Sequence, residues 1–336
     1  MWDDISACGS EYSLDGPQVG PTGDSVRECL LSEQLDAILI AERFYMARSC
    51  NEEDSDEEQW RLKITQWSFR VIDHFGLDRE VVSVAINLLD RYMSVSAISC
   101  SIDSRSFQLV AMTCLYLAMK VGSDNVSVSV HSRRKKLKLS SFVDLSRGQF
   151  EAKDIVRMEG QVLQTLAWKV SPPTPMTCVK YLLSLFSISH DPLVRQVVRD
   201  LARYLTELSV CLGSDLSTFL PSQVAAASII VAMDLLTSQA MSQETRHGFY
   251  DTVQGLWSTG DDLPYLCNRL RDSLSPDMIL REDADMEHPI TVANTYGMLR
   301  LGQHHEVRAA TPPGTPKHRR VGSGCSIEVS PVSTMR

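Results

Sequence analysis

Apolar residues recur every three or four positions through most of the chain between residues 36 and 274. This is the spacing of helices that each bury one face. The stretch 107–119 is apolar on nearly all sides, so we expect a central helix there, surrounded by others. In the first half the pattern predicts a helix at 36–48 and then five more, at about 60–75, 80–93, 105–120, from 140, and 151–168.

The second half repeats this plan after a break at Pro172, Pro173 and Pro175, because proline cannot continue the interior of a helix. Asn-Gly hairpin turns and sustained alternation of polar and apolar residues, the usual signals of strands, are nearly absent. The sequence therefore predicts an all-α fold of two consecutive five-helix units. The second-half helices are expected at about 175–187, 193–212, 221–237, 242–257 and 262–274.

The two ends of the chain are polar and show little periodicity. We expect flexible tails there and a solvated linker at the acidic run 52–58. The predicted boundaries are an acidic N-terminal tail at 1–35, a first unit with its preceding helix at 36–170, a second unit at 171–274, and a tail at 275–336.

Charge is distributed unevenly along the 336 residues, which hold 33 basic and 42 acidic side chains for a formal net charge of −9. Residues 1–58 contain 15 acidic and 3 basic residues, which leaves 59–336 with a formal net charge of +3. The acidity therefore belongs to the N-terminal segment and the acidic linker, residues 1–58. It argues only weakly against nucleic-acid binding by residues 59–336. No apolar run is long enough to span a membrane, and the acidic start predicts no signal peptide.

Signatures of catalysis are missing from the sequence. There is no GxGxxG or Walker loop, no HExxH and no GxSxG, and the nine cysteines form no CxxC pair. Cys114 falls inside the apolar stretch, where a thiol usually acts as a small hydrophobic group. We therefore expect reduced cysteines, no metal, no cofactor and no catalytic activity, which leaves a binding module.

Three segments occur in the order and approximate spacing of the cyclin box: Trp60-Arg-Leu-Lys-Ile-Thr-Gln-Trp67, Asn87-Leu-Leu-Asp-Arg-Tyr92 and Arg157-Met-Glu-Gly-Gln-Val-Leu163. In the second half, Tyr204-Leu-Thr-Glu-Leu-Ser209 and Pro221-Ser-Gln-Val-Ala-Ala-Ala227 are similar to stretches of the C-terminal cyclin fold. The chain thus resembles a cyclin over about 36–274. The resemblance implies a non-catalytic subunit that binds and activates a cyclin-dependent kinase in cell-cycle control.

The resemblance also implies roles for five residues. Arg61 and Asp90 would form an internal ion pair that fixes the first helix of the box against the second. Leu109 would belong to the central helix. Lys120 and Glu159 would be the pair that reaches the kinase and holds its backbone, since an ammonium offers donors and a carboxylate offers acceptors. From the residues alone, an ordinary salt bridge at the surface is the alternative for this last pair.

By resemblance, a shallow hydrophobic patch at Trp60, Ile64, Trp67 and Gln108 would dock basic-hydrophobic peptides from substrates or inhibitors. Lys63 stands where an aliphatic residue is usual, so one wall of such a patch is charged. Burial of the two tryptophans in the core is the alternative, and periodicity does not separate the two.

A basic cluster interrupts the helical pattern, and it consists of Arg133, Arg134, Lys135, Lys136 and Lys138. It predicts a nuclear-import signal, with a solvated loop as the alternative; imaging a chain with these five replaced by alanine would separate them. The chain is accordingly expected in nucleus and cytoplasm. Three residues precede proline and are candidate phosphorylation sites, namely Thr311, Thr315 and Ser330.

Two further functions share the predicted fold. A general transcription factor with tandem helical domains would bind DNA; the acidic balance and the Lys120 and Glu159 match favour the cyclin instead. A scaffold without kinase binding is suggested by Val121-Gly122-Ser123, which stands where many cyclins carry an acidic pair. Our expectation is a kinase partner, with no membrane and no direct nucleic acid.

Overall fold

The computed structural model describes residues 23–47, 55–95, 102–123, 138–186, 188–213, 215–257 and 262–274. Within these ranges it contains eleven α-helices, two short 3-10 helices and no strand. The predicted all-α fold class is confirmed.

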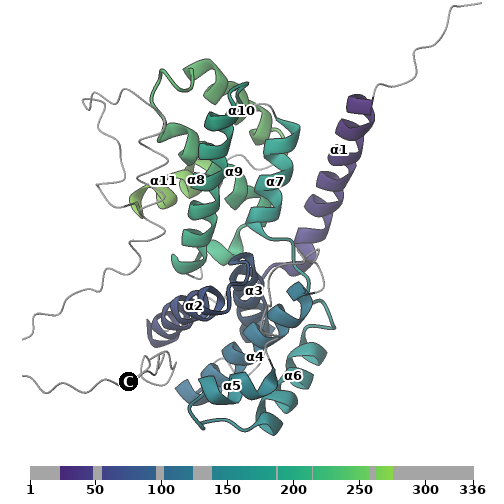
Figure 1. The fold of residues 1–336 in the computed structure, drawn as a ribbon, viewed down its shortest axis with the longest axis vertical. Helices are drawn as coiled ribbons and strands as arrows, with labels where there is room; N and C mark the ends of the chain where they lie inside the picture. Colours follow the sequence, from purple (N-terminus) through teal and green to yellow (C-terminus); the bar gives the residue numbers. More distant parts are fainter. Residues whose placement is uncertain are drawn as a thin grey trace, which may run out of the picture.

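The first unit holds five helices, as its periodicity predicts (Figure 1). They are α2 (Ser55–Phe75), α3 (Glu80–Val95), α4 (Ser104–Ser123), α5 (Leu139–Leu145) and α6 (Ala152–Thr165). The helix α4 contacts the other four. Met112, Cys114 and Leu115 in its middle are fully buried, so the expectation of a central helix is confirmed.

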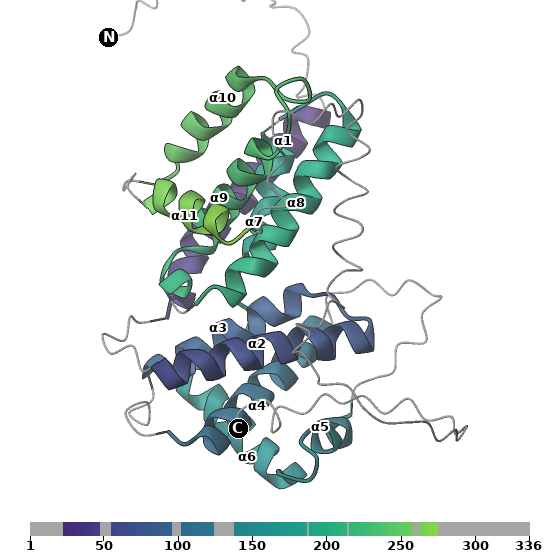
Figure 2. The same ribbon diagram turned by 90° about the vertical axis from the view of Figure 1, so that its left-hand side faces the viewer.

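The second unit repeats the arrangement around α9, which lies among its neighbours in Figure 2. Its helices are α7 (Pro175–Leu185), α8 (Pro192–Cys211), α9 (Pro221–Asp234), α10 (Gln243–Gln254) and α11 (Asp262–Asp272). Three consecutive alanines, Ala225, Ala226 and Ala227, are fully buried on α9, and their small side chains let the surrounding helices approach closely. Each unit has its own hydrophobic core.

Local signals in the sequence set several helix ends. Gly76 follows the last residue of α2 with φ of 63°, the left-handed conformation that glycine adopts without strain. Asp78 then accepts a hydrogen bond at 3.0 Å from the backbone N–H of Glu80 at the start of α3. The hydroxyl of Thr174 accepts from the N–H of Thr177 at 3.1 Å and caps α7.

The first helix differs from its prediction. It is α1 (Gly23–Glu42), which begins thirteen residues before the expected start at 36 and ends six residues before 48. The prediction of a flexible tail is therefore wrong for 23–35. Residues 27–30 are exposed, so this part of α1 shows no buried stripe from which periodicity could identify it. The first 22 residues and the predicted tail at 275–336 lie outside the described residues.

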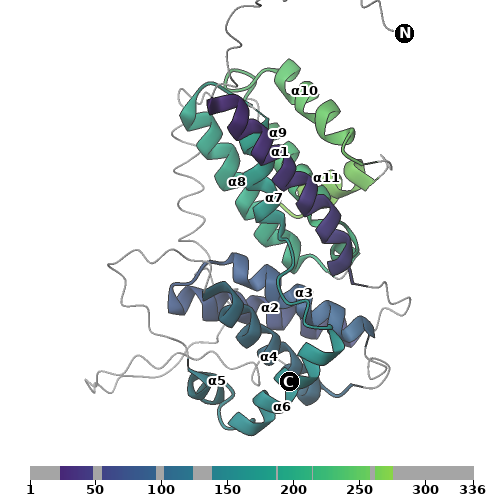
Figure 3. The ribbon, with the colours of Figure 1, turned by 90° about the vertical axis from the view of Figure 1, so that its right-hand side faces the viewer.

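The helix α1 does not pack with the α-helices that follow it directly in the sequence. Figures 1 and 3 show α1 running alongside α7 of the second unit rather than against α2–α6. Leu35 is buried in the second core, and Ile38 and Leu39 pack against it. From α1 on, the described chain therefore passes from the second unit to the first and then returns to the second. None of the helices described is long and apolar enough to cross a membrane, and the same residues form no cluster of metal ligands.

Candidate functional site

Lys120 and Glu159 meet at the surface of the first unit. Lys120 lies in the last turn of α4 and Glu159 in the middle of α6, and the Lys120 Nζ is 2.5 Å from the Glu159 Oε1. The ammonium also lies 5.1 Å from the ring centre of Tyr116, a cation–π contact. The hydrogen bond to Glu159 raises the pKa of Lys120, so the ammonium stays charged at neutral pH. The structure thus brings together the two residues that the resemblance matched.

Large apolar side chains are exposed on α6, just beyond its end, and before α2. Val156 lies one turn before Glu159 on α6 and is exposed. Trp168, just beyond the end of α6, is 71% exposed, and Phe44 in the 3-10 helix η1 (Arg43–Tyr45) is 62% exposed. The sequence pattern does not mark these residues as exposed, since Trp168 falls in the helix expected at 151–168 and Phe44 in the one expected at 36–48. Exposed aromatic groups of this size are typical of interaction surfaces.

Side chains of α3 hold η1 and the segment just after α6 together. The Arg91 guanidinium donates to the carbonyl of Lys169 at 2.8 Å and lies 5.0 Å from the ring centre of Tyr45. Asn87 donates to the carbonyl of Tyr45 at 2.9 Å. Lys169 in turn stands over the ring of Phe44 at 5.0 Å. Residues from η1 and from the end of α6 thereby form one surface, although they are far apart in sequence.

Arg61 and Asp90 form the internal pair that the resemblance implied. Arg61 donates through Nε and Nη2 to the two carboxylate oxygens of Asp90, both at 2.9 Å, which joins α2 to α3. Only 7% and 10% of the two side chains are exposed. Burial alone would lower the pKa of Arg61, but the charge and hydrogen bonds of Asp90, together with further nearby groups, outweigh burial, so the pKa is raised. Arg61 also donates to the carbonyl of Val210 on α8 at 3.1 Å, so the pair reaches the second unit as well.

Leu109, the last of the five matched residues, lies on α4 and packs against the first core while staying half-buried. Its carbonyl accepts a hydrogen bond from the hydroxyl of Thr113 at 2.7 Å. The placement of Leu109 on the central helix agrees with the resemblance.

The predicted docking patch is covered in this structure. Ile64 and Gln108 are buried, and the Trp67 side chain is fully enclosed. Trp60 is half-buried with its ring 5.7 Å from that of Phe107. Ile64, Trp67 and Gln108 match the core alternative, because an enclosed side chain offers no surface to a peptide, whereas Trp60 keeps part of its side chain exposed. The amide nitrogen of Gln108 is buried without a hydrogen-bond partner in the described part of the chain.

Several predicted sites fall where the structure gives no description. Of the basic cluster only Lys138 is described, and it is exposed just before α5. The remaining four basic residues, Arg133, Arg134, Lys135 and Lys136, lie outside the described residues, as do Thr311, Thr315 and Ser330. Nuclear import and tail phosphorylation therefore stay predictions.

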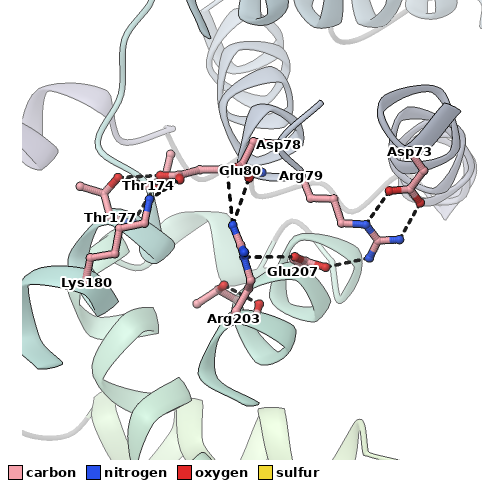
Figure 4. Close-up of polar contacts among 10 residues, drawn as sticks. Asp73, Asp78, Arg79, Glu80, Thr174, Thr177, Lys180, Arg203 and Glu207 are labelled. Atoms are coloured by element: carbon pink, nitrogen blue, oxygen red, sulfur yellow. Dashed lines mark hydrogen bonds and ion pairs between the residues drawn. The ribbon is translucent and has the colours of Figure 1, made fainter. Parts of the chain in front are cut away.

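A polar network that sequence analysis did not find joins the two units (Figure 4). Arg79, in the turn between α2 and α3, donates to both carboxylate oxygens of Asp73 and to Glu207 of α8 at 2.8 Å. Hydrogen bonds to Asp73 raise the pKa of Arg79 despite its partial burial. Arg203 of α8 pairs with Asp78 at 3.2 Å and lies 3.8 Å from Glu207. The pairs Arg79–Glu207 and Asp78–Arg203 join residues more than a hundred positions apart, so no local pattern relates them.

Glu80 extends the network to α7, on the other side of the same turn in Figure 4. Its carboxylate accepts from the hydroxyls of Thr174 and Thr177, the latter at 2.6 Å, and from the ammonium of Lys180 at 2.8 Å. Burial would raise the pKa of Glu80, but these three donors outweigh burial and lower it. Glu80 is thus held ionised between the two units.

We expect Glu80→Gln to destabilise the protein by about 1–2 kcal/mol at pH 7, since an ion pair and charge-assisted hydrogen bonds are lost. Because the folded-state pKa is lowered, the stabilisation is present above the ordinary carboxyl pKa and is lost as the pH falls through the lowered value. Urea unfolding at neutral and acidic pH should show that variant and parent differ less in their free energy of unfolding in acid. The exposed carboxyl of Asp251 offers a control, and Asp251→Asn should change the free energy of unfolding little. Equal losses in both variants would contradict the stabilising role of Glu80.

A second buried carboxylate ties α1 to the second unit. Glu42, at the end of α1, is fully buried and accepts from the backbone N–H and the hydroxyl of Ser222 at 2.9 and 2.6 Å. The indole of Trp257 donates to the same hydroxyl at 3.1 Å. Ser222 lies in the first turn of α9, where free N–H groups and the helix dipole favour a negative charge. Burial nevertheless dominates and raises the pKa of Glu42.

Two family models match this chain, one in each unit. Residues 29–171 match the model of the cyclin N-terminal domain, and residues 173–254 match that of the cyclin C-terminal domain. Cyclin-D4-1 of Oryza sativa subsp. japonica is 31% identical over 50% of this chain and 43% of its own length. Cyclin-G1 of Homo sapiens is 27% identical over 54% of this chain and 60% of its own length. A viral cyclin from herpesvirus saimiri superposes with a TM-score of 0.47 at 14% identity, covering 74% of this chain and 96% of the viral one.

The two domain models together span more than half of the chain, which therefore belongs to the cyclin family. Cyclins are non-catalytic regulatory proteins, in agreement with the lack of catalytic motifs in the sequence. The alignments span roughly two to three fifths of the length of these curated relatives.

Proposed function

We propose that this cyclin binds and activates a cyclin-dependent protein kinase through the surface around Lys120 and Glu159. The observation that carries the proposal is the meeting of these two residues on α4 and α6. They are the matched positions that, in cyclins, hold the backbone of the kinase. In the free chain their charges satisfy each other, and a partner's peptide groups would find both a donor and an acceptor here.

The exposed apolar groups support the same proposal. Trp168, Phe44 and Val156 supply the large hydrophobic contacts that a stable protein interface needs beside its polar pair. The Arg91 contacts hold two of the contributing segments in place before binding, which reduces the entropy lost on association. Binding energy gained here would shift the kinase towards the active arrangement of its own catalytic Lys–Glu pair.

Replacing both Lys120 and Glu159 by alanine should reduce recovery of the kinase by more than about tenfold, because central interface residues commonly contribute 2 kcal/mol or more. The measurement is affinity purification of the tagged full chain, mass spectrometry of the bound kinase, and a kinase assay on histone or retinoblastoma-type substrate. Helical circular dichroism should be unchanged, since an exposed ion pair contributes little to folding.

The matched control is the surface pair Arg271 and Asp234 of the second unit, whose side chains approach to 2.6 Å. Changing both to alanine removes a similar ion pair and should leave kinase recovery intact. Undiminished kinase binding by the Lys120 and Glu159 variant would contradict the proposal. A mobility-shift assay with promoter DNA on the same preparation tests the transcription-factor alternative.

A further inference from the structure

A groove of about 300 Å³ lies between the C-terminal half of α2 and the short helix α5. We call it the α2–α5 groove. Three of its lining residues are apolar: Val71 and Phe75 from α2, and Leu145 from α5. Val71 is buried and the other two are half-buried, so the groove offers apolar contact without being closed. Its size suits one or two side chains rather than a large ligand.

Basic side chains surround this apolar lining. Arg70, His74 and Arg147 all line the groove and are exposed. Among the residues that the structure describes, none of the three forms an ion pair with a carboxylate; Arg70 makes only a long contact of 3.4 Å with the carbonyl of Gln66 on its own helix. Asp144 is the one acidic group that lines the groove, so basic groups outnumber it.

The turn after α5 fixes the backbone of Arg147. Arg147 has φ of 51° and Gly148 has φ of 78°, which reverses the chain at this point. Ser146 locks the turn, because its hydroxyl donates to the carbonyl of Val143 at 2.7 Å and accepts from the N–H of Phe150 at 3.2 Å. A basic group on a fixed turn binds an anionic partner with less loss of conformational entropy.

We propose that the α2–α5 groove binds an acidic linear segment of a partner protein, one that also carries apolar side chains. The apolar lining would take those side chains, and the guanidinium groups of Arg70 and Arg147 would pair with flanking carboxylates. This preference is opposite in charge to the basic-hydrophobic peptides that the resemblance implied for the Trp60 and Trp67 positions. Binding at the groove does not require kinase activation, so it extends beyond the proposed function.

The probe is a fluorescein-labelled peptide in which Leu-Ser-Phe is flanked by Glu and Asp, titrated with the full chain in a polarisation assay. Two matched peptides carry Lys in place of every acid, or Ser in place of Leu and Phe. Saturable binding is expected for the first peptide alone, weakening as salt is added, because exposed charges are screened. Absence of binding by the acidic peptide, or equal binding by the basic one, would overturn the proposal.

The variants Arg70→Glu and Arg147→Asn test the location. Asparagine suits the second position because it tolerates positive φ better than most residues. Together they should weaken peptide binding by about tenfold at low salt, since attraction is replaced by repulsion at one side of the groove. The control Arg195→Glu makes the same charge change as Arg70→Glu, on an exposed face of α8, and should have no effect. An equal loss in the control, or equally tight binding of a single-stranded oligonucleotide, would show non-specific attraction of anions and overturn the assignment.

Discussion

Arg61→Ala is expected to lower the free energy of unfolding by about 3–5 kcal/mol, the usual effect of leaving one partner of a buried ion pair without its counterion. The change removes both hydrogen bonds to Asp90 and the bond to the carbonyl of Val210. It therefore weakens the first unit and its junction with α8 together. Because a typical domain is stable by only about 5–15 kcal/mol, the variant should be partly unfolded at 37 °C or slightly above.

Two further variants separate the charge from the packing. Arg61→Lys keeps the charge but cannot form the bidentate contact with Asp90. Its loss of unfolding free energy should therefore be smaller than that of Arg61→Ala. Replacing Arg61 by Met together with Asp90 by Leu removes both charges and should recover much of the stability, as apolar replacement of buried pairs often does. Urea unfolding followed by far-UV circular dichroism measures all of these. If Arg61→Ala cost no more than alanine at the exposed Arg195, the buried pair would have no structural role.

Glu42→Ala should cost about 2–3 kcal/mol, since it removes two hydrogen bonds accepted by a buried carboxyl group and leaves the N–H of Ser222 unpaired. The loss should appear first in α1, whose end is held there. Hydrogen exchange measured by mass spectrometry should show faster exchange in 27–42, while α4 keeps its protection.

Glu42→Gln is the matched variant, because it keeps an acceptor and has no charge to bury. Its loss at pH 7 should stay within about 1 kcal/mol. The raised pKa means that Glu42 stabilises most below its ordinary value and less as the pH rises through the raised one. The free energy of unfolding of the parent should therefore rise relative to that of Glu42→Gln as the pH falls. This is the opposite of the trend expected for Glu80→Gln. Unchanged exchange in α1 for both variants would contradict the role of Glu42.

The fold was largely predictable because each helix of the two units except α1 carries its own signal. Prolines mark the starts of α7, α8 and α9, and Gly76 marks the end of α2. The start of α1 was missed because its first described side chains are exposed. The helix α1 is stabilised by the packing of Leu35, Ile38 and Leu39, whose partners lie in the second unit. The described side chains before Leu35 are mostly exposed, so no apolar stripe extends the predicted helix back to residue 23.

The candidate site was predictable only in part. Lys120 and Glu159 were matched as motif positions, and their meeting follows from the fold. Burial of Trp67 could not be foreseen, because a stripe of apolar residues has the same spacing whether it faces the core or a groove. The contacts between the units, such as Arg79 with Glu207, join residues that are 128 positions apart and leave no local trace.

The path of α1 has a consequence for how the protein is made. Glu42 leaves the ribosome early, yet Ser222, which lies 180 residues further on, must be synthesised before the buried bond can form. During that interval the apolar side of α1 has no partner, and long-range contacts of this kind form late in folding. The second unit is therefore not a separable module. A fragment that begins at Pro175 would lack the helix that covers α7, and deletion of 23–47 would damage the unit farthest from it in the sequence.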